Sequence, residues 1–115
     1  TGVNEIGATG DPTAHAELTA IRKAAQMLGA PRLDGCVVYA SGQPCPMCLS
    51  AMYLTGVDAV RFAYSNEDGE PFGLSTATIY AEMAKPLEDQ ALDVRHQPVD
   101  PDQESPYVAW RRLQG

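Results

Sequence analysis

The sequence predicts a single α/β domain spanning residues 1–115, in which helices pack on mostly parallel strands. Three observations lead to this prediction. The length suits one domain, apolar segments of helix type and strand type alternate along the chain, and no repeat or boundary divides it. Hydrophobic residues make up 44% of the chain and charged residues 20%, which is typical of a globular protein rather than a disordered one.

The first half of the chain predicts a helix, a strand and a second helix. Apolar residues recur at helical spacing over residues 14–28, and we expect this helix to begin at Thr13 or Ala14, with Thr13 as its cap. Residues 36–41 are apolar and β-branched, which predicts a buried strand. Residues 45–55 are nearly all apolar and predict a short helix that a glycine ends.

The second half predicts two more strands and two more helices. In chain order we expect a strand over residues 59–65, a helix over 76–83, a strand over 93–97, an ordered surface loop over 98–106, and a last helix with Ser105 as cap and Pro106 in its first turn. Residues 1–10 offer at most the tail of one strand, so only three or four strands are visible for a sheet that carries helices.

The charge balance argues against nucleic acid as a partner. Eight Lys and Arg stand against fifteen Asp and Glu, for a formal net charge of −7, whereas a protein that binds DNA or RNA normally presents a basic face to the phosphates. No apolar run approaches the ~18 residues of a membrane span, and the N-terminus lacks the pattern of a secretory signal. We therefore expect a small-molecule partner and no membrane contact.

The three cysteines favour metal or redox chemistry in a reducing compartment, for which we expect the cytoplasm, over a disulfide framework. The pair Cys45 and Cys48 by itself has three possible interpretations. The pair is a thioredoxin-like redox pair, or half of a structural zinc site, or part of a catalytic zinc site with three protein ligands. A structural site needs a fourth ligand, for which Cys36 or His96 would be available.

A carboxylate on the apolar side of the first helix favours the catalytic interpretation. Glu17 shares helical spacing with Ile21, Ala24 and Leu28, so it lies on an apolar stripe. Burying a carboxylate costs several kcal/mol unless an opposite charge compensates it, as a divalent cation would. His15, two residues earlier, can converge with Glu17 on a target beyond the N-terminus of the helix.

Two helix N-termini aimed at one metal ion account for these residues together. Cys45 and Cys48 open the second predicted helix, where the helix dipole stabilises thiolates. His15 and the two cysteines give zinc three protein ligands and leave a fourth position for water. Glu17 is then free to act as general acid and base on that water.

The motifs "HAE" at residues 15–17 and "PCPMC" at residues 44–48 resemble the H-x-E…P-C-x-x-C signature of the zinc-dependent deaminases of the cytidine deaminase superfamily. Within that superfamily the chain is most similar to the guanine deaminase-type nucleobase deaminases. The segments that carry this similarity are "DPTAHAELTAIRKAAQMLGA", "YASGQPCPMCLSAMY", "IYAEMAKP" and "SPYVAWRR". The resemblance therefore covers nearly the whole chain.

The resemblance implies a three-layer α/β/α cytidine deaminase-like fold with a mixed, mostly parallel central sheet. It also implies a homodimer, with C-terminal segments exchanged between subunits in guanine deaminases. In the site it implies zinc on His15, Cys45 and Cys48, and Glu17 as the proton shuttle. The substrate contacts that it implies are Asn4, the backbone of Ala16, and Ser41.

The implied activity is hydrolytic deamination of a small free nucleobase or related aminoheterocycle (guanine-, isocytosine- or cytosine-like), with release of ammonia. The alternatives are a deaminase that edits tRNA or another nucleic acid, or one that acts on nucleosides, with the same zinc site. A structural-zinc interaction module is a further alternative.

The chain departs from the family pattern at several positions. Gly42 and Gln43 stand where cysteine and glutamate are frequent. Leu54, Ser75 and Thr76 stand where guanine deaminases tend to carry a tryptophan and an acidic pair, so the substrate base stays open. The N-terminal helix and strand pair of the family have no counterpart in the sequence, and we expect that the chain by itself is not a complete enzyme.

Overall fold

A computed structural model describes residues 1–100 and 103–114 of the protein. The residues form two compact units, Thr1–Ala84 and Lys85–Gly115, each with its own internal contacts. That residues 1–115 make up one domain stays a prediction.

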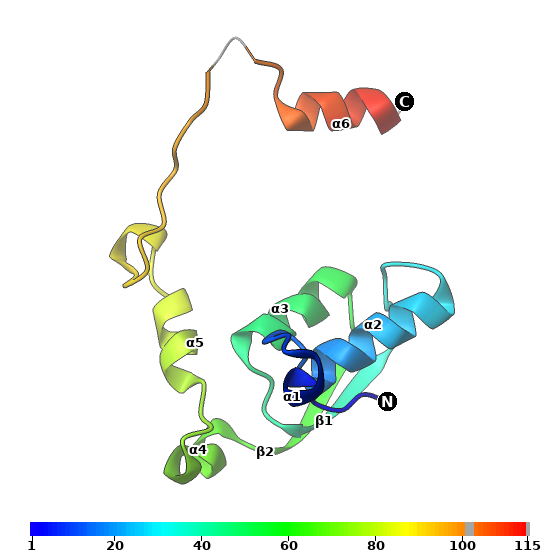
Figure 1. Ribbon diagram of the computed structural model, residues 1–115, viewed down its shortest axis with the longest axis vertical. Helices are drawn as coiled ribbons and strands as arrows, with labels where there is room; N and C mark the ends of the chain where they lie inside the picture. Colours follow the sequence, from blue (N-terminus) through cyan, green and yellow to red (C-terminus); the bar gives the residue numbers. More distant parts are fainter. Residues whose placement is uncertain (101–102, 115) are drawn as a thin grey trace. The chain divides into compact units, whose positions relative to one another are not determined.

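The first unit contains a two-stranded sheet and several helices (Figure 1). Its elements are α1 (Ile6–Thr9), α2 (Ala16–Leu28), β1 (Val37–Gly42), α3 (Pro46–Thr55), β2 (Ala59–Tyr64), α4 (Asn66–Gly69), the 3-10 turn η1 (Glu70–Phe72) and α5 (Ala77–Met83). The second unit contains the 3-10 turn η2 (Leu87–Asp89) and α6 (Pro106–Gln114). None of the helices in the described residues has the length and apolar run that a membrane span requires.

Most of the predicted elements are confirmed. β1, α3, β2 and α5 begin and end within one residue of the predicted bounds. At the start of α6 the Oγ of Ser105 accepts the N–H of Tyr107 at 3.2 Å, so Ser105 caps this helix as predicted.

The two strands pair in parallel, with Val38 opposite Val60 and Tyr39 opposite Arg61. Parallel neighbours need a crossover connection, and α3 supplies it. Val38 and Val60 pack against the core, and α2 and α3 lie side by side over this face of the sheet (Figure 1). Tyr39, on the other face, is exposed. The predicted α/β class with parallel strands is confirmed, and a helix layer and a sheet layer are present in this unit.

The buried core of the first unit lies between α2 and α3. Its members come from both helices and from the connection between α2 and β1, and they are Ile21, Leu33, Cys48 and Met52. Full burial of one large apolar side chain contributes about 1.5–3 kcal/mol, so this cluster is a main source of the attraction between the two helices. Cys48 is fully buried within it. The core and the candidate metal ligands therefore share one residue.

The first helix begins later than predicted. α2 starts at Ala16 with His15 as its N-cap, so the expected start at Thr13 or Ala14, with Thr13 as cap, is wrong. The carboxylate of Asp11 accepts hydrogen bonds from the backbone N–H and the hydroxyl of Thr13, at 2.8 and 2.6 Å. This local turn competes with the helix for the polar groups of Thr13 and keeps that residue outside it.

The strand predicted over residues 93–97 is also wrong, because these residues have no regular structure. Arg95 pairs with Asp93, with Nε 2.6 Å from a carboxylate oxygen. Val94 is the one apolar side chain of the segment. A single apolar residue offers too little burial to attach a strand to a sheet.

In the described residues no strand is present before α2 or between α5 and α6. The short helix α1 stands where the sequence was expected to offer the tail of a strand, and Gly10 ends it with φ 70°. The surface loop predicted over 98–106 includes residues 101–102, which lie outside the described residues.

Gly56 ends α3 in a left-handed conformation, with φ 76°, next to a polar contact that ties the chain before β1 to this helix end. Arg32 donates to the carbonyl of Leu54 at 3.2 Å and pairs with Asp34 at 2.9 Å. A Cβ at position 56 would collide with both the guanidinium and the carboxylate. Gly29 ends α2 with the similar φ of 68°, and a Cβ there would meet nothing within 4 Å.

We predict that Gly56→Ala destabilises the protein more than Gly29→Ala. Both variants force a side chain into the left-handed region, which costs roughly 1–2 kcal/mol. Gly56→Ala also displaces Arg32 from the end of α3, which adds about 0.5–1.5 kcal/mol for the lost hydrogen bond. Denaturant unfolding of both variants measures the difference in the free energy of unfolding. Equal losses would show that the Arg32 contact contributes nothing.

Candidate metal centre

His15 enters the site as the N-cap of α2. Its carbonyl accepts the N–H of Thr19 at 2.9 Å, so the helix begins at this residue. Its own backbone is extended, with φ −67° and ψ 152°. The direction of its side chain is therefore not set by the helical spacing of α2. This explains how His15 and Glu17 can both lie near the cysteines, although side chains two residues apart on a helix do not face each other.

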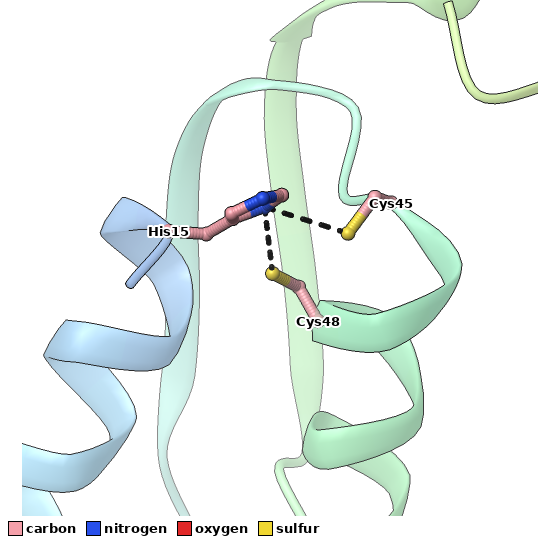
Figure 2. A group of neighbouring side chains, drawn as sticks. All are labelled: His15, Cys45 and Cys48. Carbon is pink, nitrogen blue, oxygen red and sulfur yellow. Dashed lines mark hydrogen bonds between the residues drawn. The ribbon is translucent and has the colours of Figure 1, made fainter. Parts of the chain in front are cut away.

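Cys45 and Cys48 are presented by α3 in the same way. Cys45 is the N-cap, with an extended backbone of φ −68° and ψ 166°, and Pro46 occupies the first helical position. Cys48 lies in the first turn. Figure 2 shows the imidazole of His15 directed from the start of α2 toward the two cysteines of α3.

The three side chains fit a zinc ion. Nδ1 of His15 lies 3.6 Å from Sγ of Cys45 and 3.7 Å from Sγ of Cys48, and the ligand atoms all lie within 4.8 Å of one another. Zinc bonds of ~2.3 Å to sulfur and ~2.0 Å to nitrogen, at tetrahedral angles, would place such atoms about 3.5 Å apart. Among the described residues no other His, Cys, Asp or Glu joins this group.

The electrostatics of the group also suit a cation. Burial raises the pKa of the Cys48 thiol to about 12, with further contributions from Cys45 and from the charge of Glu17, while the backbone N–H of Leu18 opposes the shift. Thiolates and a carboxylate in one partly buried place repel one another. A divalent cation reverses this effect, because coordination to it deprotonates a thiol outright.

Glu17 lies beside the group without joining it. It occupies the first turn of α2, is half-buried, and is close enough to raise the pKa of Cys48. It also lines a cavity of about 310 Å³ next to β1. Glu17 is therefore close to Cys48 and also borders a space that can hold a small molecule.

Two of the three predicted substrate contacts line the same cavity as Glu17. Ala16 precedes it in α2, and Ser41 lies near the end of β1. Asn4 does not line this cavity. It is exposed, and its side-chain carbonyl accepts the N–H of Ile6 at 2.9 Å.

The residues considered as a fourth ligand are not part of the group. Cys36 packs against the hydrophobic core, and His96 belongs to the second unit. All three cysteines are free thiols.

Tyr80 of α5 makes a contact next to the metal group that the sequence does not predict. Its hydroxyl donates to the carbonyl of Pro44, the residue before Cys45. Burial, followed by the charges of Cys45 and Cys48, raises the pKa of Tyr80. The sequence predicts the helix that carries Tyr80, but no local pattern indicates that this helix touches a loop 36 residues earlier.

The chain matches the family model described as the cytidine and deoxycytidylate deaminase zinc-binding region over residues 1–64. It is 44% identical to guanine deaminase of Bacillus subtilis (strain 168) over 112 residues, which are 97% of this chain and 71% of that protein. It is 40% identical to tRNA-specific adenosine deaminase of Aquifex aeolicus (strain VF5) over 60 residues, which are 52% of this chain and 40% of that protein.

The fold agrees with these similarities. The X-ray structure of guanine deaminase from Bacillus subtilis superposes with a TM-score of 0.84 at 43% identity, covering 96% of this chain and 70% of that chain. The resemblance to the cytidine deaminase superfamily is therefore confirmed, and zinc as cofactor agrees with both the family and the set of His and Cys donors. The chain belongs to the cytidine and deoxycytidylate deaminase family, whose members are zinc-dependent hydrolases that act on C–N bonds.

Proposed function

We propose that the chain catalyses the hydrolytic deamination of a small free nucleobase or related aminoheterocycle and releases ammonia. The observation that carries this proposal is the convergence of His15, Cys45 and Cys48, with Glu17 beside the group and not in it. The 44% identity with a guanine deaminase supports a substrate of this size.

His15, Cys45 and Cys48 hold zinc in this proposal, through Nδ1 and two Sγ atoms. When bound, zinc acts as a Lewis acid that lowers the pKa of water at the site toward ~7, so that hydroxide is available near neutral pH. Three protein ligands leave room for that water.

Glu17 moves the protons. Its carboxylate takes the proton that the water loses and delivers it to a ring nitrogen of the substrate, while the oxygen attacks the carbon that carries the amine. Glu17 then takes a second proton, from the hydroxyl group now on that carbon, and gives it to the amine as the C–N bond breaks and the C=O bond forms, so that ammonia leaves. This second transfer is needed because an amine is a poor leaving group unless it is protonated.

The substrate ring lies against the backbone of Ala16, with Ser41 near the departing amine, since both line the cavity of Glu17. Asn4 anchors the base in this proposal. To do so it must release the N–H of Ile6, which its side chain now accepts.

The base itself is tested by an ammonia-release screen over guanine, isocytosine, cytosine, an aminotriazine, nucleosides and tRNA. We expect turnover of free bases and none of tRNA, because fifteen acidic residues against eight basic ones disfavour a polyphosphate backbone. Faster turnover of tRNA than of any free base would overturn this assignment.

We further propose a homodimer in the cytoplasm. The three free cysteines support a reducing compartment. Exposed apolar side chains of α6, among them Tyr107, Trp110 and Leu113, support burial against another subunit.

We predict one zinc per chain in the purified protein. His15→Ala, Cys45→Ala and Cys48→Ala should each lose most of the zinc, because each removes one of three ligands. Cys36→Ala is the matched control and should keep it, since Cys36 packs in the core outside the group. Elemental analysis gives zinc per chain, and circular dichroism verifies that each variant is folded. Retention of zinc by folded Cys48→Ala would contradict the ligand set.

We predict that Glu17→Ala keeps zinc and loses turnover. General acid–base catalysis contributes on the order of 10²–10⁴-fold, and one residue serves both proton transfers, so the loss should reach the upper part of this range. Stability should hold or rise, because the variant removes a charge beside Cys48 and alanine is the better helix former. Glu70→Gln, an exposed acidic position in η1, is the control and should change neither property. Zinc content and ammonia release are measured on the same samples, and full zinc with undiminished turnover would refute the role of Glu17.

A further inference from the structure

We propose that Asn66 is a positioning residue of this site. It joins the loop that leads into Cys45 to α5, and it thereby sets the width of the cavity between the metal ligands and α5. The inference rests on the proposed function, because it assigns the cavity that His15 and Cys45 line to the edge of the substrate that extends beyond the ring contacts in the separate cavity of Glu17.

The first half of the connection joins Asn66 to the loop before Cys45. The backbone N–H of Asn66 donates to the side-chain carbonyl of Gln43 at 2.8 Å. Gln43 is itself held by β2, because its own N–H donates to the carbonyl of Tyr64 at 2.7 Å. Through Gln43, the backbone of Asn66 is therefore held at a fixed position relative to the end of β2.

The second half joins Asn66 to the start of α5. The side-chain carbonyl of Asn66 accepts the N–H of Thr76 at 3.2 Å and the hydroxyl of Thr76 at 3.4 Å. Asn66 is held in place by a capping box, in which Ser65 and Asp68 exchange hydrogen bonds at 2.8 and 3.2 Å. A small rigid turn therefore fixes Asn66 between the loop and α5.

These polar contacts matter because apolar packing holds α5 weakly. None of the residues of α5 is buried. Its anchors to the loop are Thr76, through Asn66, and Tyr80, whose hydroxyl donates to Pro44. Loss of the Asn66 anchor removes both hydrogen bonds that Thr76 makes to Asn66, so the start of α5 is held less firmly at its distance from the metal ligands.

The cavity that depends on this distance has a volume of about 390 Å³. His15 and Cys45 lie on one side of it, and Thr76, Ile79 and Met83 lie on the other. Among the described residues that line it, only His15 and Cys45 carry ionisable side chains. We therefore infer that it accepts an uncharged, weakly polar edge of an aminoheterocycle.

The test compares Asn66→Ala with Asn66→Asp in the zinc-loaded full chain. Asn66 uses its side chain only as an acceptor in these bonds, so Asp keeps the connection, and an acidic residue is favourable in the first turn of α4. Asn66→Ala should raise KM about 2- to 10-fold, as expected for loss of one such hydrogen bond, with kcat changed less and zinc content unchanged. Asn66→Asp should match the wild type. The probe is whichever free base of the ammonia-release screen is turned over fastest.

Amide hydrogen exchange gives a readout that does not need turnover. The N–H of Thr76 should exchange faster in Asn66→Ala and at the wild-type rate in Asn66→Asp. Faster exchange with unchanged KM would make the connection merely structural and overturn the positioning role, as would equal KM changes in both variants. If the wild type releases no ammonia from any substrate, the proposed function fails. In that case the exchange rate of the Thr76 N–H and the zinc affinity, measured by competition with a chelator, test the connection that Asn66 makes. No change in either property in Asn66→Ala would overturn the inference.

Discussion

The packing of α2 against α3 is the interaction on which the rest of the structure depends. Its centre is the buried cluster that contains Ile21, Met52 and Cys48. Because Cys48 is both a core residue and a candidate ligand, the contact that holds the two helices together also fixes one corner of the metal group. The parallel pairing of β1 and β2 directs both helices back across the same face of the sheet, so that their N-termini meet.

Both helices deliver a ligand from the cap position. His15 and Cys45 have nearly the same extended backbone, and each is followed at once by its helix. A cap residue is anchored by the first helical hydrogen bond, yet its side chain projects past the end of the helix. The first turn then adds a second functional group, Glu17 in α2 and Cys48 in α3. An imidazole, a carboxylate and two thiols are thereby supplied by two short segments.

Local patterns were sufficient to predict most of the longer helices, both strands and the metal group, because helical spacing and short motifs are properties of neighbouring residues. The start of α2 could not be predicted in the same way, since the Asp11 turn competes for the groups of Thr13 at a cost that spacing does not reveal. The segment 93–97 failed as a strand because its one apolar side chain, Val94, offers too little burial to attach it to a sheet. The contacts of Asn66 and Tyr80 bridge 23 and 36 residues, and only the folded chain brings them together.

The same arrangement couples the metal to the fold. Burial, Cys45 and Glu17 raise the pKa of Cys48 and so disfavour a thiolate at the contact between α2 and α3. A zinc ion bound there would stabilise the thiolate and join the ends of the two helices, so that the free energy of zinc binding would become free energy of folding. Glu17 is tolerated on an apolar stripe for the same reason. In the proposed function, the carboxylate that moves protons beside the substrate is also a charge that a bound cation would compensate inside the protein, which links the stability of the helix pair to the activity of the site.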